Sequence, residues 1–417
     1  MKARILRRRL IWFVLLIASI YGFFWFIGQK GDFQRPSDTS DMIAAVQYTK
    51  TGSLVSVVKN DGTIVTPDTE SGKLVSDRDI AWDPKGNRLF FISDRKDSSF
   101  HIFRWDPAHN GSPDQKSVDK AGRSNLAFDV QDKGIGELSG LVTVRGTVQE
   151  FFPKTAKSTT VMPPSGKAQM AVTDEASGAV GGAGSNMELM YSRYGVSFRV
   201  AKWFGNRQFI AAVMRREDGG ESLIVQDLTP DDKGNQRAPQ LLFIAEKINL
   251  QVDPSGGVLV FSLVNTYPMP DEKGNLQKLP FRNGLFILDP TKADAERMGP
   301  LFFAPTEELA VASFAVSPDG SLLLAAVGSS TKEGTIEVKG LLTCPLKIGG
   351  GQSMTPILAG AVADPCFSPK GDKIAFVKRE GTKRSIFVAK VDGSDQRNLT
   401  GDTGDFANPV FSPQYKY

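Results

Sequence analysis

The chain has 417 residues, with 50 lysines and arginines against 46 aspartates and glutamates, and a formal net charge of +4. Five of the basic residues precede residue 10, so the remaining 45 nearly balance the acidic residues and leave the rest of the chain close to neutral. A near-neutral domain argues against nucleic acid as a partner, because such a partner requires a basic face on the folded domain. The content of 41% hydrophobic residues with 41 glycines and 24 prolines is typical of a turn-rich globular β protein and not of a disordered chain.

The N-terminal region predicts a membrane anchor. A basic tail, residues 1–9, precedes an uncharged apolar stretch at 10–28, which is long enough to cross the hydrocarbon core as a helix. A cleaved signal peptide is the alternative reading, but the bulky residues from Ile20 to Phe26 stand where a small-residue cleavage site would lie. We therefore expect one transmembrane helix, with the lipid bilayer around it.

The basic cluster Arg7–Arg9 predicts the orientation of this helix. Such clusters stay on the cytoplasmic side, so we expect a single-pass protein of the bacterial inner membrane with its N-terminus in the cytoplasm and the rest in the periplasm. Ala18 and Gly22, four residues apart, would let a second helix approach closely, although ordinary apolar filler explains them as well. Residues 29–41 are polar and form a short linker.

From residue 42 to 417 the chain repeats one short cassette. An apolar run is followed by Asp or Ser, then by Pro, a variable residue and Gly, and then by a second β-rich run. Four copies carry Pro84 and Gly86, Pro254 and Gly256, Pro318 and Gly320, and Pro369 and Gly371, and Pro413 opens a broken fifth copy. Proline fixes φ at the second turn position and glycine suits the fourth, so each cassette predicts a β-hairpin.

The last complete unit, Phe367 to Thr400, adds a third strand and a fourth element to the hairpin. Four antiparallel strands per repeat are the signature of a propeller blade. This unit resembles the WD40-like (PD40) repeat of the TolB-type β-propellers, and the resemblance covers the chain in outline from about residue 42 to its end. It implies a propeller fold, and we expect no counterpart of the α/β domain that precedes the propeller in TolB.

The cassette spacing predicts the number of blades. Two blades without the cassette are expected at 126–144 and 200–225, and the first blade, at 43–58, lacks its first strand. Pro409–Phe411 would supply that strand and close the ring. We therefore predict an all-β fold, a closed propeller of about seven four-stranded blades behind the transmembrane helix, with an eighth blade if residues 163–198 form one.

Few residues suggest chemistry. His101 and His109 lie in one predicted blade without metal-ligand spacing, and no nucleophile elbow or phosphate-binding loop occurs. We therefore expect no enzymatic activity, no metal and no cofactor. Cys344 and Cys366 fall in different predicted blades, too far apart for a disulfide, and are expected to remain free thiols.

An insertion at residues 265–283 interrupts the blade that begins at Pro254. Tyr267, Met269, Pro270 and Phe281 are apolar residues of kinds that recur at protein interfaces, and a self-packed decoration is the alternative. With the anchor, the short tether and the neutral ring, this loop favours a non-catalytic accessory or scaffold subunit of a transport, respiratory or photosynthetic membrane complex. A periplasmic propeller that binds a small ligand, sugar or peptide in its central channel is the second hypothesis, and a propeller enzyme is the third.

Overall fold

The computed structural model describes residues 42–115 and 197–413 apart from short gaps, and between them only the strand pair β8 (Ser158–Val161) and β9 (Met170–Thr173). The short gaps fall at 51, 70–72, 84–85, 97–99, 110, 207, 217–218, 235–236, 238–239, 271–274, 333 and 349–352. The predicted tail, transmembrane helix and linker, with Ala18 and Gly22, lie outside the described residues. Within the described part, none of the helices has the length and apolar character needed to cross a membrane.

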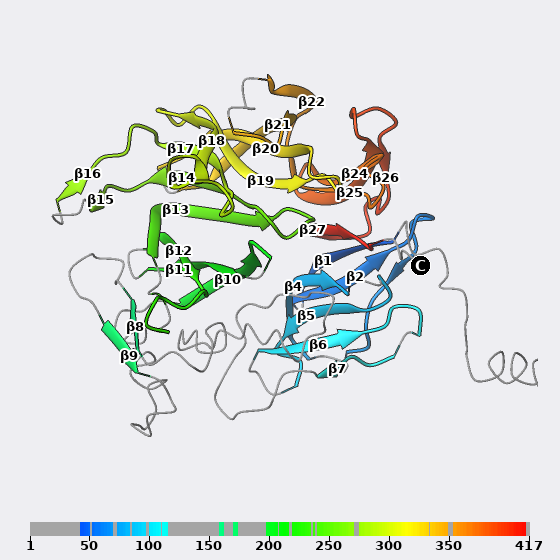
Figure 1. Cartoon of the computed structure of the whole chain (residues 1–417). Coiled ribbons are helices and arrows are strands. Elements are labelled where there is room, and N and C mark those ends of the chain that lie inside the picture. Colours follow the sequence, from blue (N-terminus) through cyan, green and yellow to red (C-terminus); the bar gives the residue numbers. More distant parts are fainter. Residues whose placement is uncertain are drawn as a thin grey trace, which may run out of the picture. The chain divides into compact units, whose positions relative to one another are not determined.

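The described chain forms four-stranded antiparallel sheets, which we call blades (Figure 1). An eight-stranded sheet contains two of them, joined by a short parallel pairing of Gly52 and Ser53 with Val75 and Ser76. A seven-stranded sheet contains two more, which share the long strand β13. Two further four-stranded sheets are separate, so the described residues contain six blades. They also contain one helical turn, α3 (Asp294–Arg297).

We label the blades A to F in chain order. Blade A consists of β27 (Asp405–Phe411), β1 (Ile43–Thr49), β2 (Gly52–Val58) and β3 (Ile64–Val65), and blade B of β4 (Val75–Trp82), β5 (Leu89–Ser93), β6 (His101–Trp105) and β7 (Asp114–Gln115). Blade C consists of β10 (Ser197–Phe204), β11 (Phe209–Arg215), β12 (Glu221–Asp227) and the first part of β13 (Gln240–Val252). Blade D consists of the second part of β13 with β14 (Leu259–Thr266), β17 (Asn283–Leu288) and β18 (Met298–Ala304). Blade E consists of β19 (Ala310–Val316), β20 (Leu322–Ser330), β21 (Ile336–Pro345) and β22 (Thr355–Ala359). Blade F consists of β23 (Val362–Phe367), β24 (Lys373–Glu380), β25 (Lys383–Lys390) and β26 (Arg397–Asn398).

The Pro-x-Gly turns have the geometry that the cassette predicts. In each of the four, the glycine N–H donates to the carbonyl oxygen of the Asp or Ser three residues earlier, over 2.8 or 2.9 Å, and the glycine φ lies between +70° and +75°. The Asp or Ser side chain also accepts the N–H five residues later, as from Leu322 to Ser317 Oγ at 2.9 Å. Pro84 itself falls in a gap of the description. The same local chemistry thus starts the second strand of blades B, D, E and F.

The C-terminal strand completes blade A, as the broken cassette predicts. β27 runs antiparallel to β1, with Phe411 opposite Ile43 and Val410 opposite Ala44, and Figure 1 shows the two side by side. The segment also contacts blade B, because Ser412 Oγ donates to the carbonyl oxygen of Gly86 over 2.8 Å. The prediction that residues 409–411 supply the missing strand is confirmed.

Neighbouring blades pack face to face through separate hydrophobic clusters. In β20 the side chain of Leu323 joins the cluster between blades D and E, and that of Leu324 joins the cluster between blades E and F. Ile374 and Ala375 of β24 divide in the same way between the E–F and F–A clusters. Successive side chains of a strand point to opposite faces of its sheet, so each middle strand is apolar on both faces. The same packing joins C to D and A to B.

The degenerate stretch between the first two cassettes is only partly described. The blade predicted at 200–225 is present as β10, β11 and β12. The blade predicted at 126–144 lies outside the described residues, as does most of the possible eighth blade at 163–198. The total of seven or eight therefore stays a prediction.

Candidate binding site

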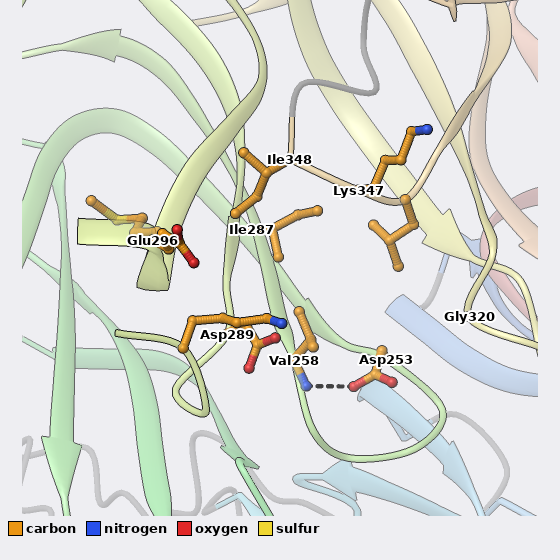
Figure 2. Close-up of a pocket in the computed structure, with 11 residues that line it drawn as sticks. Asp253, Val258, Ile287, Asp289, Glu296, Gly320, Lys347 and Ile348 are labelled. Atoms are coloured by element: carbon orange, nitrogen blue, oxygen red, sulfur yellow. Dashed lines mark hydrogen bonds between the residues drawn. The ribbon is translucent and has the colours of Figure 1, made fainter. Parts of the chain in front are cut away.

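A cavity of about 560 Å³ lies between blades D and E, beside their Pro-x-Gly turns (Figure 2). Its volume falls within the range of roughly 300–1,000 Å³ that is usual for ligand sites. Blade D contributes the turn before β14, a residue of β17 and the connection through α3, and blade E contributes the β19–β20 turn and the segment after β21. The lining residues are Asp253, Val258, Ile287, Asp289, Lys292, Glu296, Met298, Gly320, Leu346, Lys347 and Ile348.

The floor of the cavity is the edge of the D–E hydrophobic cluster. Ile287 belongs to that cluster, and Val258 and Leu346 pack against it. Met298 and Ile348 extend the apolar surface toward water, with 37% and 46% of their area exposed. Burial of apolar area contributes about 25 cal/mol of free energy per Å². An apolar group that entered the cavity would therefore gain free energy by covering these exposed side chains.

Two of the three acidic residues at the cavity hold turns in place. Asp253 accepts the N–H of Val258 at Oδ1 over 2.6 Å and that of Ser255 at Oδ2 over 3.1 Å. Asp289 accepts both the N–H and the hydroxyl of Thr291 at Oδ1, over 3.0 and 2.6 Å. Their carboxylates are therefore held in place at the cavity by the backbone.

The other charged groups at the cavity have no such role. Among the described residues, the side chains of Lys292, Glu296 and Lys347 form no ion pair within 4.0 Å and no hydrogen bond. In Figure 2 the Lys347 side chain points away from Asp289 and Glu296. The cavity thus combines an apolar floor with a rim on which carboxylates outnumber ammonium groups.

The insertion at 265–283 forms a small hairpin outside the blade ladder. Strands β15 (Met269–Pro270) and β16 (Leu276–Gln277) pair with each other, separately from the sheet of blade D (Figure 1). At its base the Tyr267 hydroxyl donates a hydrogen bond to Glu246, and the ring centroids of Phe281 and Phe286 lie 5.1 Å apart. Met269 is half-buried, and Leu276 is 71% exposed. The predicted partner residues Tyr267 and Phe281 therefore anchor the hairpin. Leu276, which is not among the residues predicted from the sequence, is an exposed large apolar residue in the described part of the hairpin.

A buried ion pair links blades A and B. Arg95 Nη2 lies 2.7 Å from Asp77 Oδ2, and the same oxygen accepts the N–H of Val55 over 3.0 Å. Burial raises the pKa of Asp77, and the charge of Arg95 and its hydrogen bonds oppose that effect. The guanidinium of Arg95 also lies over the rings of Phe91 and Phe103. Both partners of the pair belong to blade B, and the hydrogen bond from Val55 joins the pair to blade A.

The histidines and cysteines lie apart from the cavity. His101 is buried in β6, and His109 Nδ1 is 2.9 Å from Asp106 Oδ2 at the surface. No group of His, Cys, Asp and Glu side chains suited to a metal ion occurs among the described residues. Cys344 in β21 is buried and Cys366 in β23 is half-buried, and the two lie in neighbouring blades with free thiols in the structure. Burial raises the pKa of Cys344 to about 11 and that of Cys366 to about 12, which keeps both thiols protonated.

The cavity could not be found from the sequence. Gly320 was recognised as a turn residue and Asp253 as part of a cassette, but their common position depends on how blades D and E pack. Glu296, Met298 and Ile348 carry no motif. The one local signal is the charged connection from Asp289 to Arg297, which is longer than a tight turn requires.

Comparison with known proteins identifies structures of the same general kind. No protein-family model matches the chain, and no curated protein matches its sequence. TolB from Acinetobacter baumannii matches with a TM-score of 0.47 and 13% identity over 91% of this chain and 68% of that one. A chain of a nidogen/laminin complex matches with a TM-score of 0.43 and 9% identity, over 90% of this chain and 99% of that one.

A prolyl endopeptidase gives a TM-score of 0.36 and 9% identity, with 78% of this chain covering 36% of that one. Values below 0.5 at such low identity do not support an inference about function. The assignment of the fold rests on the strand pairing of blades A to F.

Proposed function

We propose that the chain is a non-catalytic, membrane-tethered β-propeller that serves as an accessory or scaffold subunit of a membrane complex. Residues 10–28 anchor it in the bacterial inner membrane, and the blades lie in the periplasm as a closed ring of about seven. The hairpin β15–β16 docks on an integral membrane partner.

The hairpin carries this proposal. It stands outside the hydrogen-bonded ladder of blade D, so the sheet does not need it. Its base is nevertheless fixed by Tyr267 and Phe281, and its Leu276 side chain remains in water. An apolar side chain held out on an ordered element gains its burial energy when a partner covers it.

Purification of the full chain in mild detergent tests the proposal. We expect the wild type to co-purify with integral membrane subunits at constant stoichiometry and Leu276→Asp to lose them. Leu74→Asp is the matched control, because Leu74 is equally exposed and lies before β4 of blade B. Recovery of a lone wild-type monomer, or retention of the complex by Leu276→Asp, would contradict the proposal. Mass spectrometry of the N-terminus tests the anchor, since a mature chain that began beyond residue 25 would exclude it.

Ligand binding is the second candidate function. The cavity between blades D and E favours it, because its size and its apolar floor suit a small molecule.

A further inference from the structure

We infer that the cavity between blades D and E binds a small organic cation with an apolar body, such as a primary amine or a guanidine that carries an aromatic or branched aliphatic group. This inference concerns residues other than the hairpin, so it can fail while the scaffold proposal stands, and the reverse.

The walls select an apolar body. Val258, Ile287 and Leu346 form a floor that belongs to the packed interior. Met298 of blade D and Ile348 of blade E continue this floor as exposed apolar walls. A ring or branched chain between them would bury apolar surface on both sides without any change in the blades.

The rim selects a positive head group. Three carboxylates line the cavity, from Asp253, Asp289 and Glu296, against the ammonium groups of Lys292 and Lys347. Lys347 points away from the acidic side in Figure 2. Asp289 uses only Oδ1 in its turn, and Glu296 uses neither oxygen among the described residues. Carboxylate oxygens only accept hydrogen bonds, and an ammonium group offers three donors.

Lys292 allows a test of whether the cavity prefers a positively charged ligand. It lies on the same connection as Asp289 and Glu296, and it pairs with neither within 4.0 Å. A bound cation would be repelled by it and attracted by Glu296. Neutralising the two residues should therefore move the affinity in opposite directions, which a purely apolar site would not do.

The test uses fluorine NMR of two probes that share one body, 4-(trifluoromethyl)benzylammonium and 4-(trifluoromethyl)benzoate. The full chain is held in lipid nanodiscs, and empty nanodiscs measure partition into lipid. We expect the ammonium to bind the wild type about tenfold more tightly than the benzoate, as a rim charge in a partly enclosed site would produce.

Four variants decide the outcome, each checked for unchanged melting temperature. Glu296→Gln should weaken binding of the ammonium about fivefold, and Lys292→Gln should strengthen it by a similar factor. Ile348→Ser should weaken both probes, because it removes an apolar wall. Glu308→Gln, exposed and outside the cavity, is the control and should change neither. Equal affinity for the two probes, no binding above empty nanodiscs, or indifference to Glu296 and Lys292 would each overturn the inference.

Discussion

Replacing Phe406 with alanine tests whether the C-terminal strand holds the fold together. Phe406 lies in β27, is fully buried, and packs in the F–A cluster against residues of blades A and F that include Ile43 and Ile386. Its strand is the first strand of blade A although it is the last along the chain. If the strand closes the structure, the loss of this ring must weaken the whole β domain and not only a frayed end.

The structure sets the expected size of the effect. Removing a fully buried phenylalanine ring costs about 3–5 kcal/mol, from lost burial and from the cavity that remains. A β domain stable by about 5–15 kcal/mol would lose a large part of its stability. Phe303→Ala in the outer strand β18 is the matched control, because its ring is 52% exposed. Its loss should cost under about 1 kcal/mol.

Thermal unfolding of the full chain in mild detergent, followed by intrinsic fluorescence, measures the difference. We expect a clear fall in melting temperature for Phe406→Ala and a larger one, or failure to fold, when residues 406–417 are deleted. The Phe303→Ala protein should melt close to the wild type. If the Phe406→Ala and Phe303→Ala proteins melt at the same temperature, β27 does not close the structure and the role assigned to the broken cassette is wrong.

Three further predictions concern a turn, an ion pair and the thiols. Gly86→Ala should destabilise more than Gly256→Ala, although both glycines have positive φ, because a Cβ at Gly86 would lie 2.2 Å from a carbonyl oxygen of the closing segment and one at Gly256 meets nothing within 4 Å; equal melting temperatures would refute this. The hydrogen bonds from Arg384 lower the pKa of Asp405 below its ordinary 3.8. The stabilisation from these bonds is therefore fully present above pH 3.8, and it is lost as the pH falls through the lowered pKa of Asp405 in the folded protein. Asp405→Asn should therefore cost at most about 1 kcal/mol at pH 7, since the pair is partly exposed, and should cost nothing in strong acid, as unfolding in urea at both pH values would show. Thiol titration of the denatured, unreduced protein should count two free cysteines, and the native protein should react slowly at pH 8; a count of zero would mean a disulfide.

Much of the fold could be predicted because its information is local. Each Asp or Ser before a proline accepts backbone N–H groups of its own turn, and each glycine supplies the positive φ that the same turn needs. The hydrogen bonds and the glycine conformation of each turn involve only six consecutive residues, so the turn can be predicted from the local sequence. The closing strand was also predictable, because Phe411–Pro413 repeats the beginning of a cassette without its end. Blade C, which has no cassette, was found only from its apolar runs.

The candidate sites were harder to predict because they depend on contacts between blades. Ile348 follows the third strand of blade E, and Met298 begins the fourth strand of blade D, so nothing in their neighbouring residues joins them. The hairpin shows the same limit on a smaller scale. Its insertion was evident, but which apolar residues pack inward depends on Glu246 and Phe286, which lie outside the insertion. Side chains chosen by type alone therefore included two that anchor the hairpin, and they did not include the exposed Leu276.

The closing strand also constrains when the fold can form. The hydrogen bond from Trp82 to Val410 joins residues 328 positions apart, and β1 has no partner on one edge until β27 arrives. The entropy cost of so long a loop grows only slowly with length, so it does not forbid closure. The unpaired edge is the greater hazard, because Ile43 to Val46 are all buried in the finished blade and would otherwise offer an apolar strand to other chains. Weakening β27 should therefore increase aggregation as well as lower the melting temperature, and a Phe406→Ala protein that melted early but stayed monodisperse would show that β1 is protected by something else.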